Sequence, residues 1–137
     1  HVRMPKHCEN GLALAKYLEH HPKIKRVIYS DLPGDPYHAL QQKYLPKGSC
    51  GVVSFEIDGG REAAETFMNA LKICAIETHV ADARSCCLNP ASTTHRQLTE
   101  EQLKEAGIPA GLVRFSCGLE NAEDLIADVE QALNEVK

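Results

Sequence analysis

The sequence predicts a single α/β domain in which helices pack on one sheet, and three observations support this fold class. Apolar residues make up 43% and charged residues 25% of the 137 residues, an ordinary globular mixture with enough apolar surface for a core. Short β-prone segments alternate with amphipathic helical segments, an order typical of helices packed on a sheet. Neither an internal repeat nor a long linker divides the chain.

Charge and hydropathy exclude several classes of protein. The net charge is −4, and no basic stripe is present, which argues against a nucleic-acid partner. No apolar run approaches the roughly 18 residues of a membrane span, and the N-terminus lacks the basic-then-apolar pattern of a signal peptide. We therefore expect a cytoplasmic protein with no membrane partner.

The first third of the chain predicts two helices around one strand. Apolar residues at helical spacing predict a helix over 10–20, which ends before Pro22. A short β-prone run follows at 26–29. Asp35 and Pro36 supply an N-cap and a first helical position, so a second helix is expected from there to about Tyr44.

The middle of the chain predicts three strands and one helix. The β-branched segment 51–57 is a strand, and the inward apolar stripe over 61–71 predicts a helix. Two shorter β-prone pieces follow at 73–76 and 84–88.

The last third predicts a helix, a strand and a helix. Thr99 and Gln102 form a capping box for a short helix that stops at Gly107, and 111–116 is a strand. Asn121 caps the final helix. Its expected inward stripe is Leu125, Ile126, Val129 and Leu133.

Six cysteines and seven histidines raise the question of a metal site or disulfides. No pair of cysteines has the C-x₂₋₄-C spacing of a zinc site, and Cys86 and Cys87 point to opposite faces of an extended segment. The chain carries no export signal and has a core of its own, so it needs no disulfide staples. We expect six reduced thiols and no metal ligands.

Three places could carry chemistry. Arg114 lies inside an apolar strand, where its guanidinium must find a carboxylate, reach solvent or face a cleft that admits an anion. The structural ion pair and the anion site are equally consistent with the sequence. The loop Asn89–His95 could line a pocket, although most such loops only connect elements. The segment Thr78–Asp82 mixes a titratable ring with a carboxylate, although a histidine there is more often an ordinary loop residue than a catalyst. Because no complete catalytic motif is present, the domain is expected to contribute to a site rather than contain one.

Three segments carry a resemblance to a known family. Gly51-Val-Val-Ser-Phe-Glu-Ile-Asp-Gly-Gly60, Asn89-Pro-Ala-Ser-Thr-Thr-His95 and Leu112-Val-Arg-Phe-Ser-Cys-Gly-Leu-Glu120, the last followed by Asp124-Leu-Ile-Ala-Asp128, resemble the C-terminal domain of the Cys/Met-metabolism pyridoxal-phosphate (PLP) enzymes. The resemblance covers essentially the whole chain, in order and with the family's spacing.

Within that family the chain is most similar to the O-acetylhomoserine sulfhydrylase branch, through Tyr44-Leu-Pro-Lys-Gly48 and Val80-Ala-Asp-Ala-Arg-Ser85. The lyase and cystathionine branches usually show Ser-Leu-Gly-Gly where this chain has His79-Val-Ala-Asp82. That serine helps to hold the substrate carboxylate, so the resemblance implies that a contact at His79 would come from its backbone. The arginine of the Arg-x-Ser-x-Gly motif is Arg114, and the resemblance implies that it binds the substrate carboxylate.

The resemblance also implies a fold and a domain organisation. The expected architecture is the small domain of the PLP fold-type-I (aspartate-aminotransferase-like) enzymes, a mostly antiparallel sheet with helices packed on one side. Residues 1–137 would form the single C-terminal domain of a larger enzyme. Its N-terminal domain would carry the Schiff-base lysine and the phosphate-binding loop, since none of the nine lysines here follows the Ser-x-Thr/Ala-Lys pattern.

The implied activity is that of a PLP-dependent transferase that converts O-acetylhomoserine and sulfide or methanethiol to homocysteine or methionine. A cystathionine γ-synthase or methionine γ-lyase of the same family is the nearest alternative. A stand-alone small-molecule-binding α/β domain and a thiol or metal module are the others. The expected partners are the N-terminal PLP domain of the same polypeptide, an amino-acid substrate and, in the intact enzyme, a homotetramer. The chain alone should be inactive and bind no cofactor.

Overall fold

Helices and strands alternate along all 137 residues of the computed structural model. The helices are α1 (Met4–Glu19), α2 (His38–Tyr44), α3 (Gly60–Ala70), α4 (Glu100–Glu105) and α5 (Ala122–Glu135). The strands are β1 (Ile24–Ile28), β2 (Val52–Ile57), β3 (Ala75–Ile76), β4 (Cys86–Leu88) and β5 (Leu112–Ser116).

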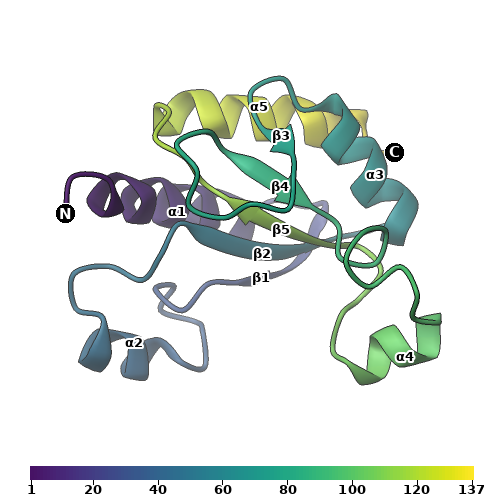
Figure 1. Ribbon diagram of the computed structural model, residues 1–137, viewed down its shortest axis with the longest axis horizontal. Helices are drawn as coiled ribbons and strands as arrows, with labels where there is room; N and C mark the ends of the chain where they lie inside the picture. Colours follow the sequence, from purple (N-terminus) through teal and green to yellow (C-terminus); the bar gives the residue numbers. More distant parts are fainter.

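The five strands form one sheet in the order β1-β2-β5-β4-β3 (Figure 1). The pairs β1–β2, β2–β5 and β4–β5 are antiparallel, and only β3–β4 is parallel. The structure thus confirms the expected mostly antiparallel sheet, with β5 at its centre.

One face of the sheet carries the core. Side chains alternate along a strand, so Val53, Phe55 and Ile57 of β2 lie on the same face and are fully buried. Phe55 packs edge-to-face on Phe67 of α3, with ring centroids 5.7 Å apart. On β5, Phe115 is paired with Val53 and joins the same core.

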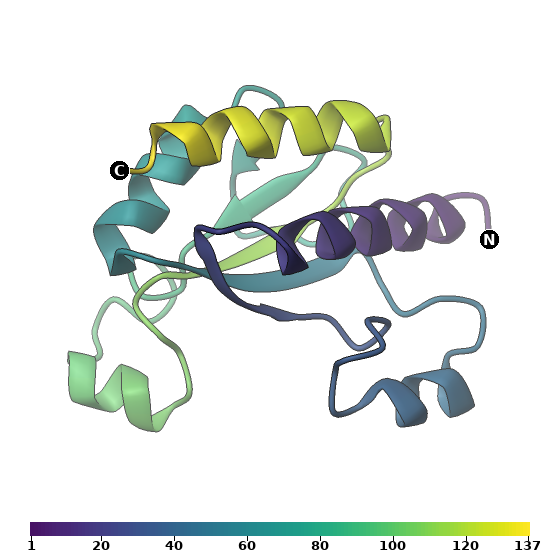
Figure 2. The same ribbon diagram turned by 180° about the vertical axis from the view of Figure 1, so that it is seen from behind.

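The three longest helices cover this core face. Figures 1 and 2 show α1, α3 and α5 on one face of the sheet, while α2 and α4 lie apart from this layer, below the β1 edge and near the two ends of the strands. The expected layer of helices on one side of the sheet is therefore confirmed, and the two short helices lie outside it. The face opposite the core, called the open face below, carries Ser54 and Arg114 as a cross-strand pair. No helix is long and apolar enough to cross a membrane.

The first helix begins six residues earlier than predicted, at Met4 instead of residue 10. The inward side of its first turns carries His7 and Asn10, which are 2% and 1% exposed. His7 Nδ1 bonds to the Cys117 carbonyl at 2.7 Å, and Asn10 Nδ2 donates to the carbonyls of Gly118 and Glu120. The inward stripe of the first turns is thus polar, and hydrophobic periodicity could not find it.

Two predicted elements are shorter than expected because side chains bind their backbone. The Asp35 carboxylate accepts the Tyr37 N–H at 2.9 Å in a turn, so α2 begins after it, at His38. The buried Asp128 carboxylate accepts the N–H groups of Lys72, Ile73 and Cys74, and β3 begins only at Ala75. Asp128 lies on the inward side of α5, whereas Ile126, expected there, is only half-buried.

Candidate anion site on the open face

Arg114 lies at the centre of the open face. It is the third residue of β5, and its cross-strand partners are Ser54 of β2 and Leu88 of β4. Its neighbours in sequence, Val113 and Phe115, are fully buried on the core face. The neighbouring strands β2 and β4 therefore hold the backbone of Arg114 on both sides. Its side chain is half-buried and points away from the core.

The guanidinium of Arg114 binds backbone carbonyls and no carboxylate. Its Nη2 donates to the carbonyl of Thr78 at 2.7 Å and to that of His79 at 3.2 Å. Its Nε is buried and has no hydrogen-bond partner. The only ion pairs in the chain are Lys6–Glu9 and Lys25–Asp58. The structural ion pair, one of the two alternatives for Arg114, is therefore absent.

The segment Thr78–Asp82, between β3 and β4, is fixed over the open face by further contacts, and we call it the strap. Ser116 Oγ accepts the Ala81 N–H at 3.0 Å. Cys86 Sγ donates to the His79 carbonyl at 3.1 Å, and Arg3 Nη2 donates to the Ala81 carbonyl. The strap is thus held at two of its peptide groups besides those that Arg114 binds.

The chain just after the strap is fastened to the end of β5. Ser85 is fully buried, and both its N–H and its hydroxyl donate to the Glu120 carboxylate, at 2.6 and 2.8 Å. The same hydroxyl accepts the Gly118 N–H at 2.7 Å. A Cβ at Gly118 would lie only 2.4 Å from the Ala83 carbonyl, so no other residue fits. The alternating residues Arg114, Ser116, Gly118 and Glu120 therefore all hold residues 78–85.

The second predicted site residue, His79, meets Arg114 through its backbone only. Its carbonyl accepts the Arg114 hydrogen bond, while the residue itself is exposed. A carbonyl repels a carboxylate, so any direct hydrogen bond from His79 to an anion would have to come from its N–H or its ring. A role for His79 in binding the substrate carboxylate remains a prediction.

The loop Asn89–His95, the other candidate pocket lining, is a packed connection. The Asn89 side chain donates to the carbonyls of Ala110 and Leu112, each at 2.8 Å, and accepts the Ser92 N–H. The Thr93 hydroxyl donates to the Asn89 carbonyl. Its polar groups therefore bind one another and the backbone at the start of β5.

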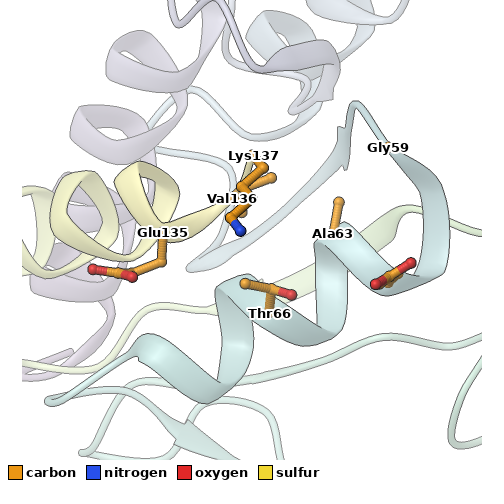
Figure 3. A pocket seen from close by; sticks show the side chains of 7 residues that line it. Gly59, Ala63, Thr66, Glu135, Val136 and Lys137 are labelled. Atoms are coloured by element: carbon orange, nitrogen blue, oxygen red, sulfur yellow. The ribbon is translucent and has the colours of Figure 1, made fainter.

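A hollow of about 380 Å³ lies on the helix side of the molecule (Figure 3). It is lined by Gly59, Glu62, Ala63, Thr66, Glu135, Val136 and Lys137. It shares no residue with the surroundings of Arg114, and two of its lining side chains are carboxylates. These two carboxylates would repel the carboxylate of an amino acid, and Lys137 is the one cation of the lining.

The thiols show no metal centre. No three His, Cys, Asp or Glu side chains converge as metal ligands, and all six cysteines are unpaired. Burial raises the pKa of the Cys86 thiol, and Glu77 raises it further, against an opposing effect of Arg114. Cys86 is therefore a neutral thiol beside the strap and can donate its S–H.

Sequence reasoning found Arg114 and assigned no role to the residues that hold its surroundings. Cys86 and Glu120 carry no signal of their own in composition or periodicity. Ser116 and Gly118 did carry a signal, because they belong to the Arg-x-Ser-x-Gly motif and every second side chain of a strand shares a face with Arg114.

Comparisons with known proteins agree on one family. The family model for Cys/Met metabolism PLP-dependent enzymes matches residues 1–134. The chain is 43% identical over 135 residues to an L-methionine gamma-lyase of Fusobacterium nucleatum, covering 98% of this chain and 34% of the relative. It is 42% identical over 136 residues to an O-acetyl-L-homoserine sulfhydrylase of Leptospira meyeri, covering 98% and 31%.

A solved structure agrees as well. An O-acetylhomoserine (thiol)-lyase of Campylobacter jejuni superposes with a TM-score of 0.90 at 40% identity, covering 97% of this chain and 32% of that one. That structure carries a pyridoxyl-lysine phosphate, at a lysine outside the matched part. The chain spans about a third of the length of the curated relatives it matches. By fold and by sequence, the chain belongs to the family of PLP-dependent enzymes of cysteine and methionine metabolism.

Proposed function

We propose that residues 1–137 are the C-terminal domain of a longer PLP-dependent enzyme and bind the α-carboxylate of its amino-acid substrate through Arg114. The observation that carries the proposal is the state of the guanidinium. It is fixed by the Thr78 and His79 carbonyls, lacks a carboxylate partner and keeps a buried Nε–H without an acceptor. A positive charge that is held in place but not neutralised is a seat for an anion.

The residues around Arg114 suit the substrate rather than the cofactor. No lysine, whose amine could hold the cofactor aldehyde, takes part in the hydrogen bonds that Arg114 and the strap make. Lys23, for example, donates its hydrogen bonds to the carbonyls of Leu133 and Val136 instead. We propose that an N-terminal domain of the same polypeptide holds PLP, and that the intact enzyme is a homotetramer.

The proposed reaction is replacement at Cγ of O-acetylhomoserine. The C–O bond to acetate breaks, a C–S bond to sulfide or methanethiol forms, and homocysteine or methionine results. When bound, PLP supplies an electron sink for the carbanions at Cα and Cβ. Arg114 holds the α-carboxylate still, so that the Cα–H bond stays perpendicular to the conjugated plane. A guanidinium on a rigid strand suits this task because its nitrogens can bind both carboxylate oxygens.

A methionine γ-lyase is the second candidate. The relatives of that activity are as similar to the chain as the sulfhydrylases, at 43% against 42% identity. The same carboxylate site would serve either enzyme. The sequence His79-Val-Ala-Asp82, which departs from the pattern usual in the lyase branch, favours the sulfhydrylase.

The test uses the complete polypeptide that contains the chain, loaded with PLP. Incubation with O-acetylhomoserine and sulfide should release acetate and homocysteine in equal amounts. Incubation with methionine alone should yield little methanethiol and 2-oxobutanoate. The opposite pattern would assign the enzyme to the lyases, and activity with neither substrate would overturn both candidates.

A further inference from the structure

The strap joins Arg114 to two residues with no direct contact to a substrate in the proposed function. Arg114 Nη2 donates to the Thr78 and His79 carbonyls. The orientation of the guanidinium therefore depends on where those two peptide groups lie. Whatever fixes the strap also fixes the cation.

Two buried side chains fix the strap from the sheet. Ser116 and Cys86 are 2% and 1% exposed and face one another across β4 and β5. Ser116 Oγ accepts the Ala81 N–H, and Cys86 Sγ donates to the His79 carbonyl. The His79 carbonyl is thus shared by Cys86 and Arg114 at 3.1 and 3.2 Å.

The backbone of the strap shows that these contacts hold it against a local preference. Ala81 has a φ of +56° and is the only residue other than glycine with a positive φ. The left-handed region is unfavourable for a residue with a Cβ, and such residues keep it only where the surroundings impose it. At Ala81 the N–H is bound by Ser116 and the carbonyl by Arg3.

We propose that Ser116 and Cys86 are positioning residues that orient Arg114 toward the substrate carboxylate by fixing the strap. The inference rests on the proposed function, because it concerns the carboxylate site formed by Arg114. Loss of either contact leaves the guanidinium in place on β5 but frees the carbonyls that aim it. Carboxylate binding then weakens, while the rest of the ligand is held as before.

The test compares two competitive inhibitors of the complete, PLP-loaded enzyme. L-norleucine carries an amine, an α-carboxylate and an apolar chain, and pentylamine is the same molecule without the carboxylate. Ser116→Ala and Cys86→Val should each raise the inhibition constant of L-norleucine about three- to tenfold, the range for one neutral hydrogen bond. The constant for pentylamine should stay within about twofold.

Two further variants serve as controls. Cys86→Ser keeps a donor to the His79 carbonyl and should bind L-norleucine nearly as the parent does. Ser30→Ala removes a half-buried hydroxyl whose partner is Ser49, at 2.9 Å, and which makes no hydrogen bond to the strap, so it should change neither constant. In an Arg114→Ala background, Ser116→Ala should add nothing to the loss, since both act on one interaction.

The outcomes separate this inference from the proposed function. If Arg114→Ala leaves L-norleucine binding unchanged, the proposal that Arg114 binds the substrate carboxylate is wrong. If Arg114→Ala weakens it but Ser116→Ala and Cys86→Val do not, the positioning role is wrong and the carboxylate site stands. Equal weakening of L-norleucine and pentylamine would also overturn the positioning role, because a general loss of structure does not select the carboxylate.

Discussion

The Nη2 atom of Arg114 lies 2.7 Å from the carbonyl oxygen of Thr78, which comes 36 residues earlier in the chain. A carbonyl accepts the hydrogen bond without cancelling the charge. The guanidinium is therefore oriented by its neighbours yet stays a full cation on the open face. This is the state expected of a group that awaits an anion, since no reorganisation is needed when the anion arrives.

Replacing Arg114 should strongly weaken substrate capture in the complete enzyme. A hydrogen bond to a charged group is worth roughly 1.5–3 kcal/mol, so the loss of two in Arg114→Ala should lower kcat/KM about a hundredfold or more. Arg114→Lys keeps the charge but loses the fork and should stay clearly impaired. Steady-state kinetics on O-acetylhomoserine measure both effects.

Thermal melts of the same variants supply the control. Arg114 makes no ion pair, so Arg114→Ala strands no buried carboxylate, and the melting temperature and PLP content should change little. A sharp fall in melting temperature, with normal kcat/KM in the enzyme that remains folded, would instead show that Arg114 only supports the fold.

The alternation of buried and outward side chains along β5 could be predicted from the sequence, because it depends only on neighbouring residues. Val113 and Phe115 are apolar and Arg114 is not, so period two alone places the arginine on the face opposite the core. The polar first turns of α1 could not be predicted from the sequence. Nor could the two hydrogen bonds from Ser85 to the Glu120 carboxylate, which we call the latch. Each depends on a partner that lies 35 or 110 residues away in sequence, and a polar residue with a distant partner looks the same as one in solvent.

The strap shows the same limit for the candidate site. Sequence reasoning singled out Thr78–Asp82 because it mixes a histidine with a carboxylate, but the groups that meet Arg114 are its backbone carbonyls. Every residue has a carbonyl, so no residue type marks this contact. Only the path of the chain decides which carbonyl faces the guanidinium.

The latch between Glu120 and Ser85 should contribute measurably to stability. Glu120→Ala leaves the N–H and hydroxyl of fully buried Ser85 without their acceptor, which should lower the free energy of unfolding by about 2–3 kcal/mol. Urea titration of the 137-residue chain measures it. Glu130→Ala, at an exposed position of α5, should cost about 0.5 kcal/mol or less. Equal losses in the two variants would show that the latch contributes nothing.

Ala81→Gly should stabilise the chain. Glycine adopts a φ of +56° without the steric cost that alanine carries, which is about 1 kcal/mol, partly offset by the greater freedom of glycine in the unfolded chain. Ala83→Gly, two residues on and without a positive φ, has only the entropic effect and should destabilise by about 0.5–1 kcal/mol. The urea midpoint should rise in Ala81→Gly and fall in Ala83→Gly relative to the parent chain. A shift of the midpoint in the same direction in both variants would contradict the strain at Ala81.

The thiols should all be reduced, and they should differ in reactivity. Alkylation of the unfolded chain without reductant should modify six thiols by mass spectrometry. In the native chain, half-buried Cys8 and Cys50 should react before the four buried cysteines, because burial limits access. Four or fewer modified thiols after unfolding would mean that disulfides form after all.

Stability should fall in alkaline solution because acids are buried in their neutral form. Burial raises the pKa of Cys117 above its ordinary 9.0 and that of Tyr29 above its ordinary 10.0. A group with a raised folded pKa contributes stability that is complete below its unfolded pKa and is lost as the pH rises toward the folded value. Each such group can therefore add a slope of up to about 1.4 kcal/mol per pH unit above its ordinary pKa, which is roughly pH 9 for Cys117 and pH 10 for Tyr29.

Urea unfolding between about pH 7 and pH 10.5 measures this slope, and Cys117→Ala identifies part of its source. The variant should be less stable than the parent at neutral pH, because it leaves a small void where a fully buried sulfur lay. It should lose less stability above pH 9, since one buried acid is gone. The two curves should converge as the pH rises. Parallel curves across the whole range would show that ionisation of Cys117 has no part in the alkaline loss.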